Sequence, residues 1–137
     1  MVHDLKTTDV TKSLYANYLK RAEECMHAAE HSFDIQEWNA ATISAIHSCI
    51  AACDAMCVYF LGKRYSGENR GDAVKLFRAI RADDKEINVN ANRILRTNRI
   101  KNMAEYEERL VFRSEAERVL KDCERLLEYV KKELPIT

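Results

Sequence analysis

Residues that let a chain reverse direction are scarce in this sequence. Glycine and proline together make up 4 of the 137 residues, about 3%, against roughly 12% in an average globular protein. A strand-rich fold needs a turn about every 8–12 residues, usually built on glycine, proline or Asn-Gly. We therefore expect an all-α protein: one domain, a bundle of about five helices with its core at about residues 11–134. All three glycines fall within residues 62–71, which predicts one substantial loop.

Five segments with helical hydrophobic periodicity follow one another along the chain. We expect helices at about residues 11–32, 37–61, 73–81, 85–103 and 114–134. Short polar side chains stand where three of these helices begin and are suited to cap the free N–H groups of the first turn. They are Thr8 or Asp9 for the first helix, Asp72 for the third and a Ser114–Glu117 capping box for the last.

The charges balance, with 22 basic and 22 acidic residues. This balance argues against a dedicated, strongly basic nucleic-acid binder but leaves room for a local basic patch. A hydrophobic content of 47% excludes a disordered chain. We see no secretory signal, so the five cysteines, an odd number, are interpreted as reduced thiols of a cytoplasmic protein.

The least charged segment runs from Trp38 to Leu61 and contains a single charged residue, Asp54. Its several polar residues favour a buried core helix over a membrane span. Cys49, Cys53 and Cys57 follow one face of this helix among isoleucine and methionine, which is typical of core packing rather than of a soft-metal site. We expect no membrane contact, no metal and no cofactor.

Two other patterns are weaker than the functional motifs they resemble. His27 and His31 stand one turn apart, but the glutamate precedes the second histidine instead of following the first, so we expect a solvated pair rather than zinc ligands. Lys63 and Arg64 follow Gly62 in the loop, but no Walker A sequence is present. Helix termination explains these glycines, and a basic loop that faces a substrate is the alternative.

The most informative segment is 93–106, which has four basic residues within nine positions and no acid before Glu105. A helical projection places Asn98 and Asn102 on the apolar face, where an amide needs a hydrogen-bonding partner. Two interpretations stay open. The helix end simply runs into solvent, or this segment lines a cleft or a subunit interface through Asn98, Arg99, Asn102 and Tyr106. Arg96 and Lys101 join these four as candidate ligand-binding residues.

The order of these features resembles the HEPN family (higher eukaryotes and prokaryotes nucleotide-binding domain) from about Tyr18 to Leu134. The resemblance is carried by the segments that begin at Tyr18-Leu-Lys-Arg, Trp38-Asn-Ala-Ala, Phe60-Leu-Gly, Gly71-Asp-Ala-Val, Arg99-Ile-Lys-Asn and Ser114-Glu-Ala-Glu. It implies a small helical bundle, commonly a homodimer. Many members are metal-independent endoribonucleases with the motif Arg, four to six residues, His. Others bind RNA or nucleotides, or are non-catalytic partners of minimal nucleotidyltransferases.

This sequence departs from the catalytic motif. Arg99 fits the motif arginine, and Tyr106 fits a tyrosine often found two residues after the histidine, but Ala104 stands between them and no histidine follows His47. The resemblance therefore implies a non-catalytic module that binds RNA, a nucleotide or a partner protein. One alternative is a ribonuclease of altered chemistry, with Arg99 stabilising charge and Glu105 or Tyr106 moving the proton. The other is an antitoxin-like or scaffold partner of a nucleotidyltransferase.

Overall fold

The computed structural model describes residues 4–135, and within that range the chain forms five α-helices and two short strands. The strands β1 (Thr7–Asp9) and β2 (Lys63–Tyr65) pair in antiparallel fashion. The predicted all-α architecture is confirmed, with this small sheet as an unpredicted addition. The helices are α1 (Tyr15–Asp34), α2 (Trp38–Leu61), α3 (Arg70–Arg78), α4 (Lys85–Tyr106) and α5 (Arg113–Glu133).

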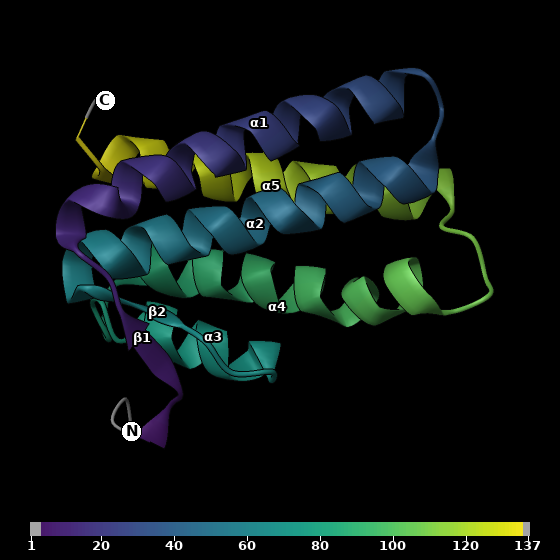
Figure 1. Cartoon of the computed structure of the whole chain (residues 1–137). Coiled ribbons are helices and arrows are strands. Elements are labelled where there is room, and N and C mark those ends of the chain that lie inside the picture. The colour runs from purple at the N-terminus through teal and green to yellow at the C-terminus, as the bar shows by residue number, and fades with distance from the viewer. Residues whose placement is uncertain (1–3, 136–137) are drawn as a thin grey trace.

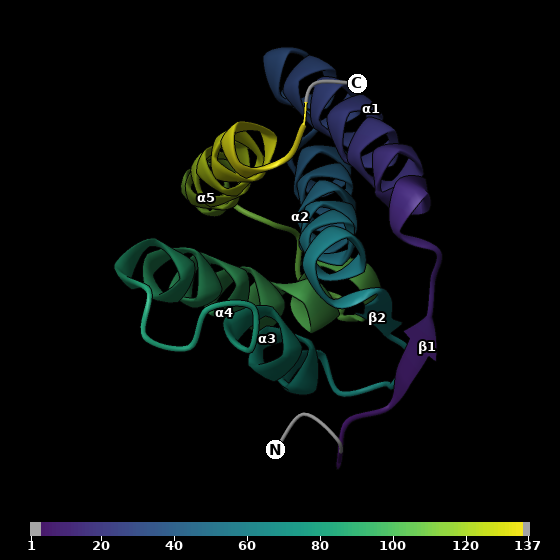
Figure 2. The same cartoon turned by 90° about the vertical axis from the view of Figure 1, so that its left-hand side faces the viewer.

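Helix α2 lies at the centre of the molecule and packs against α1, α4 and α5 (Figures 1 and 2). Small side chains line it, and Ala41, Ala45, Ala52 and Ala55 are fully buried, which lets neighbouring helices approach closely. By length and composition α2 could cross a membrane. However, 67% of its most apolar window is buried inside the protein, as expected for the core helix that the sequence predicted.

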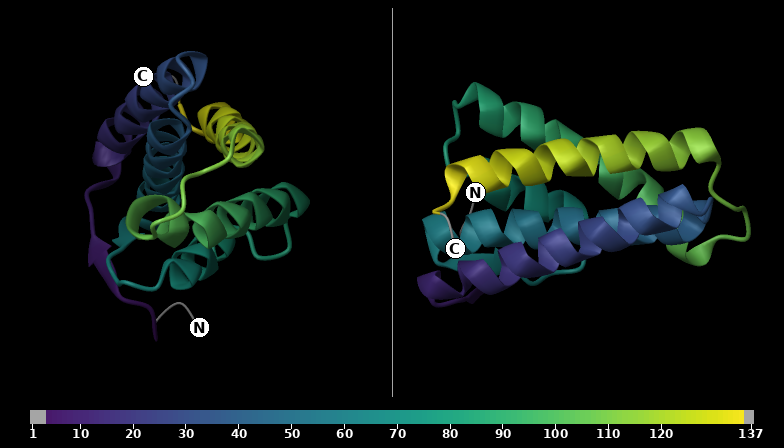
Figure 3. Two further views of the ribbon diagram at one scale, coloured as in Figure 1. Left: turned by 90° about the vertical axis from the view of Figure 1, so that its right-hand side faces the viewer. Right: turned by 90° about the horizontal axis from the view of Figure 1, so that it is seen from above.

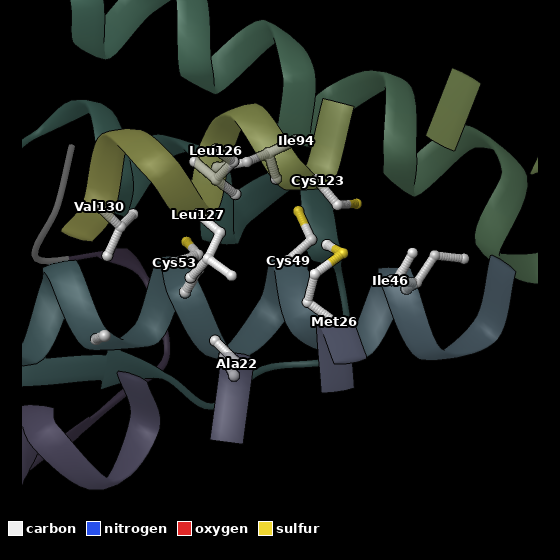
Figure 4. Packing of buried hydrophobic residues seen from close by; sticks show 14 of the residues in the cluster. Ala22, Met26, Ile46, Cys49, Cys53, Ile94, Cys123, Leu126, Leu127 and Val130 are labelled. Atoms are coloured by element: carbon white, nitrogen blue, oxygen red, sulfur yellow. The ribbon is translucent and has the colours of Figure 1, made fainter. Parts of the chain in front are cut away.

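The cysteines of α2 belong to this core. Cys49, Cys53 and Cys57 are buried, and Cys49 lies beside Cys123 of α5 (Figure 4). A hydrogen bond with Cys123, together with burial, raises the pKa of the Cys49 thiol well above its usual value, so the thiol stays protonated. The predicted packing role is confirmed. Among residues 4–135, no three His, Cys, Asp or Glu side chains are placed to hold a metal ion.

The first and third helices begin at positions that the sequence did not predict. A turn of 3₁₀ helix, η2 (Lys12–Leu14), precedes α1. Thr8 and Asp9 lie in β1 instead of capping that helix, because they pair with Arg64 and Lys63 of β2. Helix α3 begins three residues before the predicted start. Asn69 rather than Asp72 caps it, with the Asn69 Oδ1 atom accepting the N–H of Gly71 at 2.9 Å.

The predicted capping box of the last helix, Ser114–Glu117, is also wrong, because the helix begins earlier than predicted. Helix α5 begins at Arg113, so Ser114 already lies inside the first turn. Glu115, not Glu117, accepts the backbone N–H of Phe112 at 2.9 Å. Two hydrogen bonds from the guanidinium of Arg109 and this N–H lower the pKa of Glu115 to about 2. The carboxylate thus fixes the connection between α4 and α5.

One end of the bundle gathers exposed apolar side chains. The α1–α2 turn and the α4–α5 connection both lie at this end (Figures 1 and 3). Leu110 and Phe112 of the connection are 72% and 60% exposed, and Ile35 of the turn is half exposed. Tyr106, the last residue of α4, adds an aromatic ring to this end. We refer to Ile35, Tyr106, Leu110 and Phe112 as the apolar end.

Candidate nucleic-acid interface on α4

Helix α4 is a continuous 22-residue helix that no glycine or proline interrupts. It begins at a capped terminus, where the Asp84 Oδ1 atom accepts the N–H of Ile87 at 2.9 Å. It extends three residues past the predicted end, to Tyr106. Its side chains therefore reach three surroundings: the core, the flank of α5 and the solvent. Its buried residues are Ile87, Asn90, Ala91, Ile94, Thr97 and Ala104.

The buried face of α4 does not follow the predicted line through both asparagines. Asn98 is half-buried and its amide donates to the backbone carbonyl of Arg70 at 3.1 Å, whereas Asn102 is exposed. Thr97 takes the inward position instead, because its hydroxyl is satisfied by the carbonyl of Arg93 at 3.0 Å. The buried face therefore continues through Thr97 and Ala104, and the expected inward position of Asn102 is wrong.

Arg96 faces α5 rather than an open surface. Its guanidinium donates two hydrogen bonds to the carboxylate of Asp122, at 3.0 and 2.9 Å. This pairing raises the pKa of Arg96 and offsets its charge. Arg96 therefore joins α4 to α5, and its guanidinium is less available to a ligand than its sequence position suggested.

Arg99, Asn102 and Tyr106 share the solvent face of α4. They are spaced three and four residues apart, which places them on one side of a helix. Arg99 is exposed and makes no hydrogen bond, ion pair or ring contact with any residue in the described range 4–135. Asn102 has a single long contact of 3.5 Å with Glu107, and Tyr106 is 74% exposed. We refer to Arg99, Asn102 and Tyr106 as the outer face of α4.

A second group of polar residues lies beside the outer face, between α4 and α2. The ammonium of Lys101 is 3.2 Å from Glu105 Oε2 and 5.9 Å from the centre of the Tyr106 ring. Glu105 Oε1 is buried without a hydrogen bond, and the His47 Nε2 atom of α2 lies 3.7 Å from it. At that distance the two groups form an ion pair when the imidazole carries its second proton.

His47 is the functional candidate that the sequence prediction missed. It lies on a different helix from the basic segment, and only the packing of α2 against α4 brings it near Glu105. One signal could have found it. Apart from the cysteines and a tyrosine, His47 and Asp54 are the titratable side chains of α2, and His47 is left out of the inward-facing pattern of that helix.

The structure also shows which positions of α4 share a surface with Arg99, as a catalytic imidazole would have to. Ala104, which the resemblance aligns with the motif histidine at a four-residue spacing, is 6% exposed and points into the core. A side chain at that position does not share a surface with Arg99. Tyr106 follows Arg99 at a six-residue spacing and does share its face. The outer face therefore has the phenol of Tyr106 at the position where proton transfer would need an acid or a base.

The family model of the HEPN domain matches residues 15–134, which is most of the chain and includes all five helices. No curated protein matches the chain. The outer face, the His47–Glu105 pair and the apolar end all lie within the matched region.

Proposed function

We propose that this chain, which belongs to the HEPN domain family, binds single-stranded RNA through the outer face of α4 without cleaving it. The family is associated with nucleotides and RNA. The observation that carries this proposal is the environment of Arg99. Its guanidinium is exposed and has no partner within residues 4–135, next to an exposed amide and an exposed aromatic ring.

These three side chains match the chemistry of a nucleotide. A free guanidinium binds a backbone phosphate, an amide pairs with the polar edge of a base, and a tyrosine ring stacks on the base. Stacking of this kind needs a base that is not held in a duplex, so single-stranded RNA is the favoured substrate. Lys101 lies over the ring of Tyr106 and adds a positive charge at the same place.

We also propose that two copies of the chain associate through the apolar end. Leu110 and Phe112 are among the most exposed large apolar side chains, and contiguous exposed apolar surface marks interaction sites. Tyr106 belongs both to the apolar end and to the outer face of α4. A symmetric dimer here would bring two copies of Tyr106, one end of each outer face, to one interface. A nucleotidyltransferase partner seated on the apolar end is the alternative occupant.

The RNA-binding proposal is tested by fluorescence anisotropy with a labelled single-stranded RNA at about 50 and about 200 mM salt, because phosphate contacts release counterions. We expect affinity to fall steeply with salt, and Arg99→Ala to weaken binding about tenfold. Arg96→Ala is the matched control, because that arginine is already paired with Asp122. Equal loss of affinity in the two variants, or absence of any binding, contradicts the proposal.

A second candidate function is favoured by one observation, the 3.7 Å approach of His47 to Glu105. This pair supplies, from α2, the imidazole that α4 lacks, and supports a metal-independent ribonuclease of altered chemistry with Arg99 stabilising the charge of the transition state. Incubation of the protein with RNA in a metal chelator tests it. Cleavage that His47→Ala abolishes supports this function, and RNA that stays intact overturns it.

A further inference from the structure

Asp54 is the one charged residue of α2 and lies in an unusual position for a carboxylate. Its side chain is nine-tenths buried, with 9% exposed, and it forms no hydrogen bond or ion pair within residues 4–135. Burial raises its pKa to about 6, against the opposing effect of Arg70, Arg64 and Arg21. The carboxylate oxygens of Asp54 are not among the enclosed, unpaired side-chain atoms of residues 4–135, so they keep contact with solvent and can accept hydrogen bonds from a ligand.

Asp54 lines a pocket in the groove between α1 and α2. The pocket has a volume of about 200 Å³, smaller than the roughly 300–1,000 Å³ of pockets that hold drug-sized ligands. It therefore has room for one planar ring system. Its wall is part polar and part apolar and is made by Arg21, Cys25, His47, Ile50, Ala51 and Asp54.

The charges around the pocket disfavour a cation. Three arginines lie close enough to Asp54 to influence its carboxyl group, and their combined charge exceeds that of the single carboxylate. The occupant that fits presents N–H donors to Asp54 and acceptor atoms or a negative group to Arg21 and His47 at the wall.

We propose that this pocket binds a single guanine base. Guanine presents an N–H and an amino group side by side, which a carboxylate can accept together, and next to them two acceptor atoms for Arg21 or His47. Adenine presents an acceptor at the corresponding ring position, cytosine also presents one there, and uracil has one N–H between two carbonyls. Ile50 and Ala51 provide apolar contact for the ring.

The guanine belongs either to a free nucleotide or to an unpaired position in RNA. The RNA source rests on the proposed function of the outer face of α4. His47 connects the two places, because it lines the pocket and also lies 3.7 Å from Glu105 of α4. Helix α2 lies between α1 and α4 (Figure 1), so a strand with one base in the pocket could continue toward α4.

Binding of the four nucleoside monophosphates, followed by NMR, tests the proposal. We expect GMP to bind at least about tenfold more tightly than AMP, CMP or UMP, and to shift the amide signals of Cys25, His47 and Asp54. Asp54→Asn, a change of nearly equal volume, abolishes this preference. Asp72→Asn is the matched control, because that aspartate pairs with Lys75 on α3, away from the pocket wall. Equal binding of all four nucleotides overturns the proposal.

A second measurement needs no variant and holds if Asp54→Asn fails to fold. Cys25 is the one cysteine that is not buried, and it lines the pocket. GMP, but not AMP, slows its alkylation by a maleimide. An equal rate with both nucleotides contradicts the proposal.

Two RNA oligonucleotides of equal length, with and without a central guanine, separate the pocket from the outer face. Tighter binding of the guanine-containing RNA supports both proposals. Equal binding of the two leaves RNA binding by α4 standing and overturns the pocket as a site for guanine in RNA. GMP selectivity without any RNA binding supports a free-nucleotide site and removes the proposed function of the outer face.

Discussion

Helices α2 and α4 are of similar length but differ in the number and exposure of their charged side chains. In α2, a single charged side chain stands among 24 residues and is nine-tenths buried. In α4, most of the charged side chains are exposed or paired, Arg96 with Asp122 of α5 and Lys101 with Glu105 of α4 itself. The charge of Asp54 therefore affects the stability of the fold as well as the pocket that it lines, whereas the exposed charge of Arg99 affects only what the surface can bind. Four substitutions test this contrast.

The largest effect is expected for Asp54→Asn. The folded state binds a proton at this carboxyl more tightly, with a pKa of about 6, than the unfolded chain does at about 3.9. Between these values the folded state holds more protons, so this residue makes the native protein less stable as the pH rises. The variant should gain about 2–3 kcal/mol in free energy of unfolding at about pH 7 and little at about pH 4.

Urea denaturation of both proteins at the two pH values measures this difference. A variant that is less stable than the native chain at neutral pH would show that the carboxylate has a stabilising partner. The contrast between α2 and α4 would then fail at its strongest point.

Ala104→His tests whether a polar side chain at a buried position of α4 lowers stability, as the buried carboxylate of α2 does. Ala104 is 6% exposed, so a larger polar side chain should lower the free energy of unfolding by about 2 kcal/mol, through overpacking and an unsatisfied ring nitrogen. It should confer no RNA cleavage. Thermal unfolding of this variant beside Tyr106→His, which changes an exposed position, provides the measurement. Unaltered stability of Ala104→His contradicts its inward placement.

Tyr106→Ala should leave stability unchanged and weaken RNA binding about tenfold, because loss of one base–aromatic stack costs about 1–3 kcal/mol. Tyr106→Phe keeps the ring and should bind as the native chain does. Anisotropy titration of the three proteins gives the comparison. If the phenylalanine variant loses as much affinity as the alanine variant, the hydroxyl rather than the ring makes the contact.

The smallest effect is expected for Arg96→Ala. Its pair with Asp122 is bidentate, but the side chain of Arg96 is half exposed, and pairs of this kind contribute less than about 1 kcal/mol. Calorimetry should show a small decrease in melting temperature with RNA affinity retained. A large decrease in affinity would place Arg96 on the binding surface together with Arg99.

The fold was largely predictable because its signals are local. Helical periodicity and scarce turn residues predicted five helices, and one nearly uncharged segment predicted the central one. Pairing of Thr8 with Arg64, by contrast, joins residues far apart in the chain, and it removed the predicted cap of α1. The register of α4 shifted because Thr97 could bury its hydroxyl against a carbonyl of its own helix, a compensation that a hydrophobic pattern does not record.

The candidate site likewise combines features that the local sequence predicts with features that depend on tertiary packing. Arg99 and Tyr106 were predicted to act together from the spacing of the motif that the segment resembles, although the predicted helix ended at about residue 103 and α4 extends to Tyr106. The approach of His47 to Glu105 and the pocket beside Asp54 depend on how helices pack against one another. Local patterns therefore predicted which residues stand out, and tertiary packing decided which of them meet.

The proposed RNA site is the outer face of α4. An NMR titration of the native chain with a short single-stranded RNA tests it most directly, because the backbone signals report each residue separately. We predict that the largest shifts occur at Arg99, Asn102 and Tyr106, and that Arg96 and Asp122 move little. Shifts confined to other surfaces, or a spectrum that RNA leaves unchanged, would contradict it.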